Sequence, residues 1–185
     1  MATIIVHPEA VVVHIGPLQA IVMRDQVFCF NIYHPLTVSL VSHWPSKYGR
    51  ATTDSRFHEL RCLEVLLLEL IHYLEWRFNQ LAPELCDLLE GVLSTQTPEQ
   101  LQDLLESSLR LNDFHEEVGQ VAVELGKLLN SDEDMAGLYL TPNRATGEHE
   151  EAELLLEALD HTVRDLLLSI AVTDTIHRSQ RLITD

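Results

Sequence analysis

The sequence predicts an α+β fold, with a small antiparallel sheet at the N-terminus followed by long antiparallel helices. Short β-branched runs separated by turn residues lie between residues 10 and 31, and from about residue 54 the apolar residues recur at spacings of three and four. The chain has 185 residues, of which 46% are hydrophobic, enough for a core of one domain. We expect a β-rich subdomain over 1–53 and a long-helix subdomain over 54–185, together forming one folded unit.

The predicted strands are three short apolar runs. They cover residues 10–15, 18–23 and 26–31. Gly16 and Pro17 close the first run, and Arg24 and Asp25 separate the other two at hairpin spacing. These turn residues predict consecutive antiparallel strands. Pro35, Pro45 and Gly49 then indicate loop, with a weak additional strand predicted at 36–41.

The first long helix is predicted to begin near Asp54 or Ser55, either of which can serve as its N-cap. Its apolar residues keep a helical period up to Leu81. Pro83 is predicted to break or kink it, leaving a shorter piece that ends near Leu93.

A second long helix is predicted from Pro98, with Thr97 as its cap and Gln100 completing a capping box. Asn130 and Ser131 end it. A short helix is then expected at 132–140, a polar loop at 141–148, and a last long helix from about Glu150.

Charge excludes several classes of partner. The chain has 12 basic and 29 acidic side chains, and residues 99–160 alone contain 3 and 16. A net charge of −17 excludes nucleic acid and disfavours an anionic membrane surface, whereas cations become the natural small partners. Three cysteines without a CxxC pair favour a reducing compartment. We find no apolar stretch of about 18 residues that would span a membrane and no secretory signal.

Signatures of catalysis are absent from the sequence: it has no nucleophile elbow, no phosphate-binding glycine loop and no HExxH. We therefore expect no enzyme, no small-molecule substrate and no organic cofactor. His58 and Cys62 share one helix face, but zinc needs three or four ligands, so an ordinary helix surface is the better interpretation.

Hard divalent cations fit the residues better. Asp113 and Glu117 are four residues apart on one predicted helix, so both carboxylates point from one face. Mg²⁺ takes few carboxylates and keeps several waters. The competing interpretation is an ordinary solvated acidic face. The acids at 132–134 are explained by the first turn of a helix capped by Ser131.

Four ordered segments resemble the eukaryotic, mitochondrial-type branch of the CorA-like magnesium transporters. The family segment DEDM-A-x-x-YLT matches 132–141, and its EE-x-E-x-LLE helix matches 150–157. Residues 57–64 resemble the helix start PFE-x-RALE, and residues 10–30 resemble the hairpin AILVNIGPIRAII-x-x-DRVLLF. Together these matches span about residues 10–170.

The resemblance implies a soluble N-terminal domain whose last helix leads toward a membrane segment. In the family five subunits surround a pore, and two transmembrane helices follow, with a Gly-Met-Asn signature after the first. Neither feature occurs in these 185 residues, so we expect a regulatory domain that cannot conduct ions alone. The resemblance also implies a homo-oligomer, pentameric in the full-length family. It places the chain at the mitochondrial inner membrane, facing the matrix, with another organellar membrane as the alternative.

The resemblance further implies Mg²⁺ sensing through carboxylates at subunit contacts. Aligning the motifs places Asp25, Asp113, Glu117 and Glu157 at acidic positions of the family. Two departures concern the last helix. Val172 replaces one family acid, and residues 177–180 (HRSQ) replace an acidic segment near the membrane.

Two hypotheses about function remain open on the sequence. One is a divalent-sensing domain of a magnesium channel, in which bound Mg²⁺ neutralises facing carboxylates and holds subunits together. The other is a helical interaction module, or truncated relative, without a specific cation site. The first predicts an effect of Mg²⁺ that NaCl at matched ionic strength does not reproduce, and the second predicts that the salts act alike.

Overall fold

A four-stranded antiparallel sheet forms the N-terminal part of the protein in our computed structural model, which describes residues 2–49, 58–95, 97–140 and 149–184. The strands follow the chain in the order β1-β2-β3-β4. They are β1 (Ala2–His7), β2 (Ala10–Ile15), β3 (Leu18–Met23) and β4 (Val27–Cys29). The hairpin turn at Arg24 and Asp25 is confirmed, since Val22 pairs with Val27 across it.

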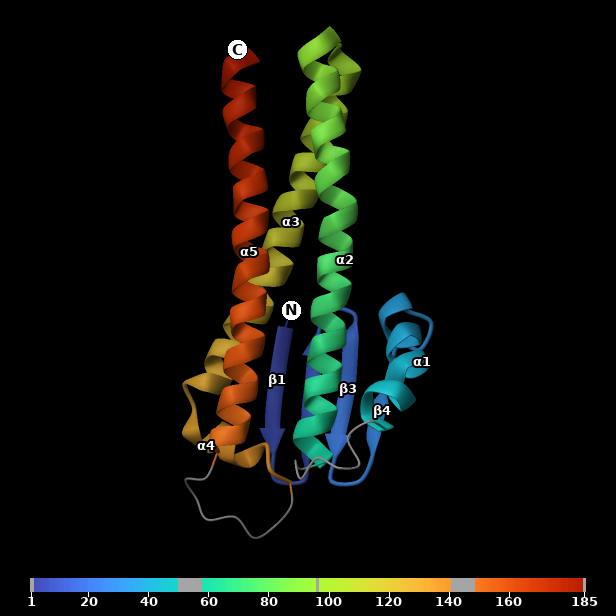
Figure 1. The fold of residues 1–185 in the computed structure, drawn as a ribbon, viewed down its shortest axis with the longest axis vertical. Coiled ribbons are helices and arrows are strands. Elements are labelled where there is room, and N and C mark those ends of the chain that lie inside the picture. Colours follow the sequence, from blue (N-terminus) through green and yellow to red (C-terminus); the bar gives the residue numbers. More distant parts are fainter. Residues whose placement is uncertain (1, 50–57, 96, 141–148, 185) are drawn as a thin grey trace.

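Long helices account for most of the remaining chain. They are α2 (His58–Thr95), α3 (Pro98–Leu129) and α5 (Glu150–Thr184), which pack on one another in all three pairings. Two shorter helices, α1 (Pro35–Gly49) and α4 (Asp132–Gly137), lie beside the sheet and at the end of α3. Figure 1 shows that the long helices extend well beyond the sheet, with the α2–α3 turn and the C-terminus at the same end.

One face of the sheet supplies the strand contribution to the core. Alternate residues on β2 and β3 point to this face and are buried, and they pair across the ladder as Val11 with Val22 and Val13 with Ala20. Helix α2 contacts β3 and covers this face. The main core cluster joins these strand residues to α2, α3 and α5, so residues on both sides of position 53 share it.

The signals at the start and end of α3 are confirmed. The Thr97 side chain accepts a hydrogen bond from the backbone N–H of Gln100, whose own side chain accepts from the Thr97 N–H, and Pro98 is the first helical residue. Asn130 caps the C-terminal end, and the Ser131 side chain caps α4 by accepting from the Asp134 N–H. The proposed N-cap at Asp54 or Ser55 and the loop at 141–148 lie outside the described residues.

Two predictions between the sheet and α2 are wrong. Residues 36–41 form no strand, because they belong to helix α1. Pro35 is the first residue of this helix, and Pro45 and Gly49 also belong to it, so none of the three marks a loop. Proline fits the first turn of a helix, where its missing N–H would have no partner in any case. The His34 ring also accepts a hydrogen bond from the Leu36 N–H, at 3.2 Å between the nitrogens, and this stabilises the helix start.

Pro83 does not break the helix, since α2 continues through it to Thr95. The proline removes one backbone hydrogen bond, but buried Leu81 and Leu85 on either side hold the helix in the core. At the ends of other elements the differences are small: β4 is shorter than 26–31, and α4 ends at Gly137 instead of residue 140. Strand β1, which the sequence analysis did not predict, pairs with β2 along its full length.

Candidate cation site

A pocket of about 340 Å³ lies between α2 and α3, and Asp113 and Glu117 both line it. Asp113 is exposed and Glu117 is partly buried. The predicted placement of the two carboxylates on one face of one helix is therefore present, and this face opens onto the pocket. Glu84, Arg77 and Arg110 also line it, so three carboxylates share the pocket with two guanidinium groups.

The arginines of the pocket are paired with its glutamates. A nitrogen of Arg77 lies 2.6 Å from Oε2 of Glu117, and a nitrogen of Arg110 lies 2.7 Å from Oε1 of Glu84. The Arg77 guanidinium also lies over the Phe114 ring, 4.9 Å from its centroid. Asp113 adds a third negative charge beside these two ion pairs, so the titratable groups of the pocket sum to −1.

The turn between β2 and β3 contacts the same glutamate. Gly16 has a φ of +52°, and a Cβ built on it would lie 3.2 Å from Oε1 of Glu117. Glycine tolerates this φ and leaves room for the carboxylate. Glu117 is thus positioned between the sheet turn on one side and Arg77 of α2 on the other.

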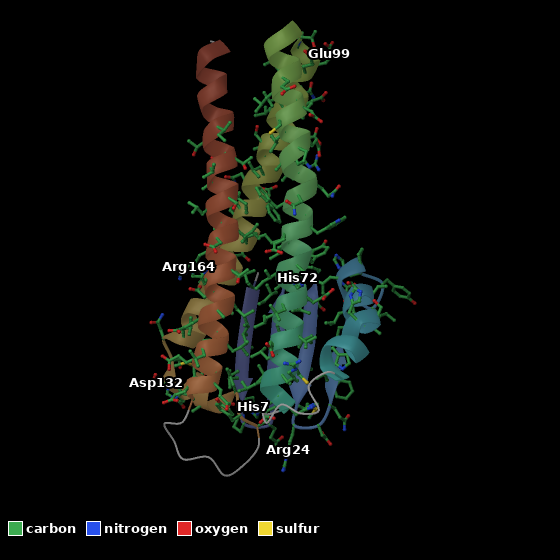
Figure 2. The ribbon with its side chains drawn as sticks, in the orientation of Figure 1. His7, Arg24, His72, Glu99, Asp132 and Arg164 are labelled. Atoms are coloured by element: carbon green, nitrogen blue, oxygen red, sulfur yellow. The ribbon has the colours of Figure 1, made fainter. Side chains whose placement is uncertain are left out.

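Asp25 lies away from this pocket within one chain. It is exposed in the turn that follows β3, whereas Gly16 precedes β3 at the opposite end of the same strand. Six strand residues span roughly 20 Å at about 3.3 Å per residue. Figure 2 shows its neighbour Arg24 at the end of the sheet remote from the tips of the long helices.

Glu157 is likewise separate from Asp113 and Glu117. It is exposed on α5. Farther along the same helix, Ile170 lies beside Leu111 and His115 of α3, where these residues line one groove. The thirteen residues from Glu157 to Ile170 correspond to roughly 20 Å of helix. One chain therefore brings together two of the four predicted carboxylates.

Within the part of the chain that the structure describes, no group of three or more His, Cys, Asp or Glu side chains is arranged to hold a metal ion. Two carboxylates still suffice to anchor Mg²⁺ that retains water or gains ligands from a second molecule. His58 and Cys62 do lie close, with 3.5 Å between Nε2 and Sγ. Burial, with smaller contributions from Glu59 and Cys29, raises the pKa of the Cys62 thiol to about 12, so it is a poor ligand for a soft metal.

Sequence reasoning missed Arg77, Arg110 and Glu84, although a signal for them exists. The capping box at Thr97 marks the turn of an antiparallel helical hairpin. Arg77 and Glu117 lie twenty residues before and after Thr97, and Glu84 and Arg110 lie thirteen residues before and after it. In a tight antiparallel hairpin, residues equidistant from the turn face each other. Opposite charges at equal distances therefore predict both ion pairs.

The DEDM segment acquires a structural explanation. Its three acids occupy the first turn of α4, where the helix dipole favours them. Farther along the segment, the Tyr139 hydroxyl accepts a hydrogen bond from the Ala152 N–H at 3.2 Å and so helps to satisfy the first turn of α5. This segment therefore joins α3 to α5.

Comparison with known proteins decides the family. A family model described as magnesium transporter MRS2-like matches residues 1–184. The chain belongs to the MRS2-like magnesium transporter family. The resemblance seen in the four sequence motifs is thereby confirmed.

Several curated relatives of this MRS2-like chain are similar over most of its length. The mitochondrial inner membrane magnesium transporter mrs2 of Schizosaccharomyces pombe is 28% identical over 180 residues, which cover 89% of the chain and 42% of the relative. The mitochondrial inner membrane magnesium transporter LPE10 of Yarrowia lipolytica is 27% identical, with 94% and 42% covered. The mitochondrial magnesium transporter MRS2 of Saccharomyces cerevisiae is 27% identical, with 84% and 34% covered.

The MRS2-like chain spans less than half the length of these relatives. Their names are those of transporters rather than enzymes. Among its described residues, no helix combines the length and the apolar character needed to cross a membrane.

Proposed function

We propose that this chain is the cation-sensing, regulatory part of a CorA-like magnesium transporter, and that the full protein transports Mg²⁺ across the mitochondrial inner membrane. The family match over 1–184 and the relatives' names support the transported ion and the membrane. What supports sensing most directly is the position of Asp113 and Glu117 together on a pocket. The sensor faces the matrix in this proposal.

The sensing site is completed between copies of the chain. Asp25 and Glu157 lie roughly 20 Å from the Asp113–Glu117 pair along β3 and α5, so one ion cannot contact all four within one chain. Both are exposed and available to a neighbouring molecule. We assign them to contacts in a homo-oligomer, with five copies as the state that the family resemblance implies.

Mg²⁺ acts as the switch through charge. Bound ions neutralise facing carboxylates and hold the copies in a closed arrangement. When the ions are released, each chain has a net charge of −17 and repels its neighbours. The assembly is thereby loosened. A ligand can shift the assembly in this way only because it binds one arrangement more tightly than the other.

The test is calorimetric titration with Mg²⁺ of the double variant Asp113→Ala and Glu117→Ala. We expect affinity to fall by about tenfold or more, because two carboxylate ligands are lost. The matched control replaces Asp103 and Glu106, exposed acids on the same helix, with alanine and makes the same change in net charge. Equal affinities for the two double variants would contradict the site.

A helical interaction module without a specific cation site is the second candidate. The Arg77–Glu117 ion pair favours it, because Glu117 already has a cationic partner. This function predicts that Mg²⁺ and NaCl at equal ionic strength have the same effect on the molar mass measured by light scattering. A change at low millimolar Mg²⁺ that NaCl does not reproduce would reject it.

A further inference from the structure

Arg77 is held against Glu117 by more than its charge. Its guanidinium lies 4.9 Å from the centroid of the Phe114 ring and 5.8 Å from that of Tyr73. These rings come from both helices that form the pocket, α3 and α2. Stacking of this kind fixes a planar guanidinium and limits the entropy lost on pairing with a carboxylate. The 2.6 Å contact to Glu117 Oε2 is therefore preorganised.

We propose that Arg77 is a built-in competitor of the divalent cation and sets the concentration at which the site responds. This inference rests on the proposed function of Asp113 and Glu117. A cation that binds Glu117 must displace the guanidinium from Oε2 or bind beside its positive charge, and both oppose binding.

The second arginine of the pocket offers an internal comparison. Arg110 is paired with Glu84 and not with the predicted cation ligands, and both of these side chains are more exposed than Arg77 and Glu117. Arg164, on α5, is paired with Asp160 outside the pocket. Replacing either arginine with glutamine changes net charge as Arg77→Gln does, but leaves Glu117 with its partner.

The experiment is Mg²⁺ titration at constant ionic strength with Trp76 fluorescence as the readout. Trp76 lines the pocket, and the chain has one other tryptophan, so the Trp44→Phe background makes the signal local. We expect Arg77→Gln to tighten Mg²⁺ binding roughly two- to fivefold. Arg164→Gln should shift it by less than about twofold, because an exposed distant charge is screened, and Arg110→Gln should fall between them.

Two further variants separate competition from general electrostatics and from misfolding. Adding Asp113→Ala and Glu117→Ala to Arg77→Gln should abolish the gain. Arg77→Lys keeps the charge but loses the planar fork, and should tighten binding by less than Arg77→Gln. Thermal melting checks that each variant folds, and the lysine variant is decisive if the glutamine variant does not fold: unchanged affinity would then overturn the proposal.

The outcomes distinguish this proposal from the function on which it rests. Equal affinities for Arg77→Gln and Arg164→Gln would overturn the competition, as would a gain that persists without Asp113 and Glu117. If Asp113→Ala with Glu117→Ala weakens Mg²⁺ binding in the chain that retains Arg77, the sensing function is supported whether or not Arg77 competes. If neither the unmodified chain nor any variant binds Mg²⁺, both the competition by Arg77 and the sensing function are rejected.

Discussion

Glu124 shows how a buried charge joins the two parts of the fold. This residue lies on α3 and is 7% exposed. One oxygen accepts a hydrogen bond from the backbone N–H of Ile4 on β1, at 3.4 Å, and the other pairs with Lys127 Nζ at 2.5 Å. Strand β1 is at the sheet edge, where outward N–H groups lack a strand partner. Glu124 supplies that partner and so ties the sheet to α3.

The buried thiol of Cys62 is expected to make the stability of the protein depend on pH. Burial raises the pKa of its thiol from 9.0 to about 12 in the folded protein, whereas the unfolded chain has the ordinary pKa. Below pH 9 the thiol keeps its proton in both the folded and the unfolded state, so the free energy of unfolding does not change on its account. As pH rises from 9 toward 12 the unfolded state releases the proton first, so the free energy of unfolding falls. Between pH 8 and pH 10, proton release from Cys62 lowers the free energy of unfolding by about 1 kcal/mol.

Urea unfolding at pH 8 and pH 10 measures this effect. The Cys62→Ala variant should lose about 1 kcal/mol less than the unmodified chain over this interval, whatever its stability at pH 8. Parallel losses in the two proteins would show that the thiol does not contribute. Part of the remaining slope is expected from Cys29, whose pKa burial also raises.

At the scale of elements, α4 packs closely against β1 because Gly137 has no side chain. A Cβ built there would lie 2.7 Å from Cγ1 of Val6. Valine is stiff about χ1, so the backbone of the edge strand would have to shift. We expect Gly137→Ala to lower the free energy of unfolding by about 1–3 kcal/mol, measured in urea.

Gly119→Ala serves as a control, because it is expected to change stability in the opposite direction. It lies within α3, and a Cβ added to it meets nothing within 4 Å. Gly119→Ala should therefore raise stability, by up to about 1 kcal/mol, through helix propensity. A loss of stability in both variants would show that the contact with Val6 is not the cause in Gly137→Ala.

The elements also show where local sequence signals suffice. The capping box at Thr97 and the cap at Ser131 were predicted because their hydrogen bonds join residues three positions apart. Residues 36–41 and Pro83 were wrongly interpreted because local propensity does not include packing. Helix α1 contacts α2, and the residues flanking Pro83 are in the core, so tertiary burial outweighs the local preference in both places.

At the scale of the whole molecule, two apolar stripes stay exposed beyond the sheet. Each has three residues at spacings of four. They are Leu101, Leu105 and Leu109 on α3, and Leu168, Val172 and Ile176 on α5. The start of α3 and the last turns of α5 lie at the same end of the molecule in Figure 1. In the proposed homo-oligomer, we expect these exposed stripes to contact another copy.

Substitution within the α5 stripe tests self-association. We expect Leu168→Glu to weaken Mg²⁺-dependent association by about tenfold, as loss of one central apolar contact does at protein interfaces. Light scattering over a protein dilution series in Mg²⁺ measures it. Val38→Glu, at a comparably exposed site on α1 (54% against 65%), should have little effect. Equal effects at the two sites would contradict a role for the stripe.

The sequence alone determined the α+β class, the order of the long helices, the caps and the Asp113–Glu117 spacing, because periodicity and capping are local properties of the chain. What these carboxylates face depends on how the helices pack. Arg77 lies forty residues before Glu117, and the antiparallel packing of α2 on α3 makes them partners. Separation of Asp25 and Glu157 from that pair is equally a property of the packed chain, since strand and helix lengths set distances that no local pattern encodes.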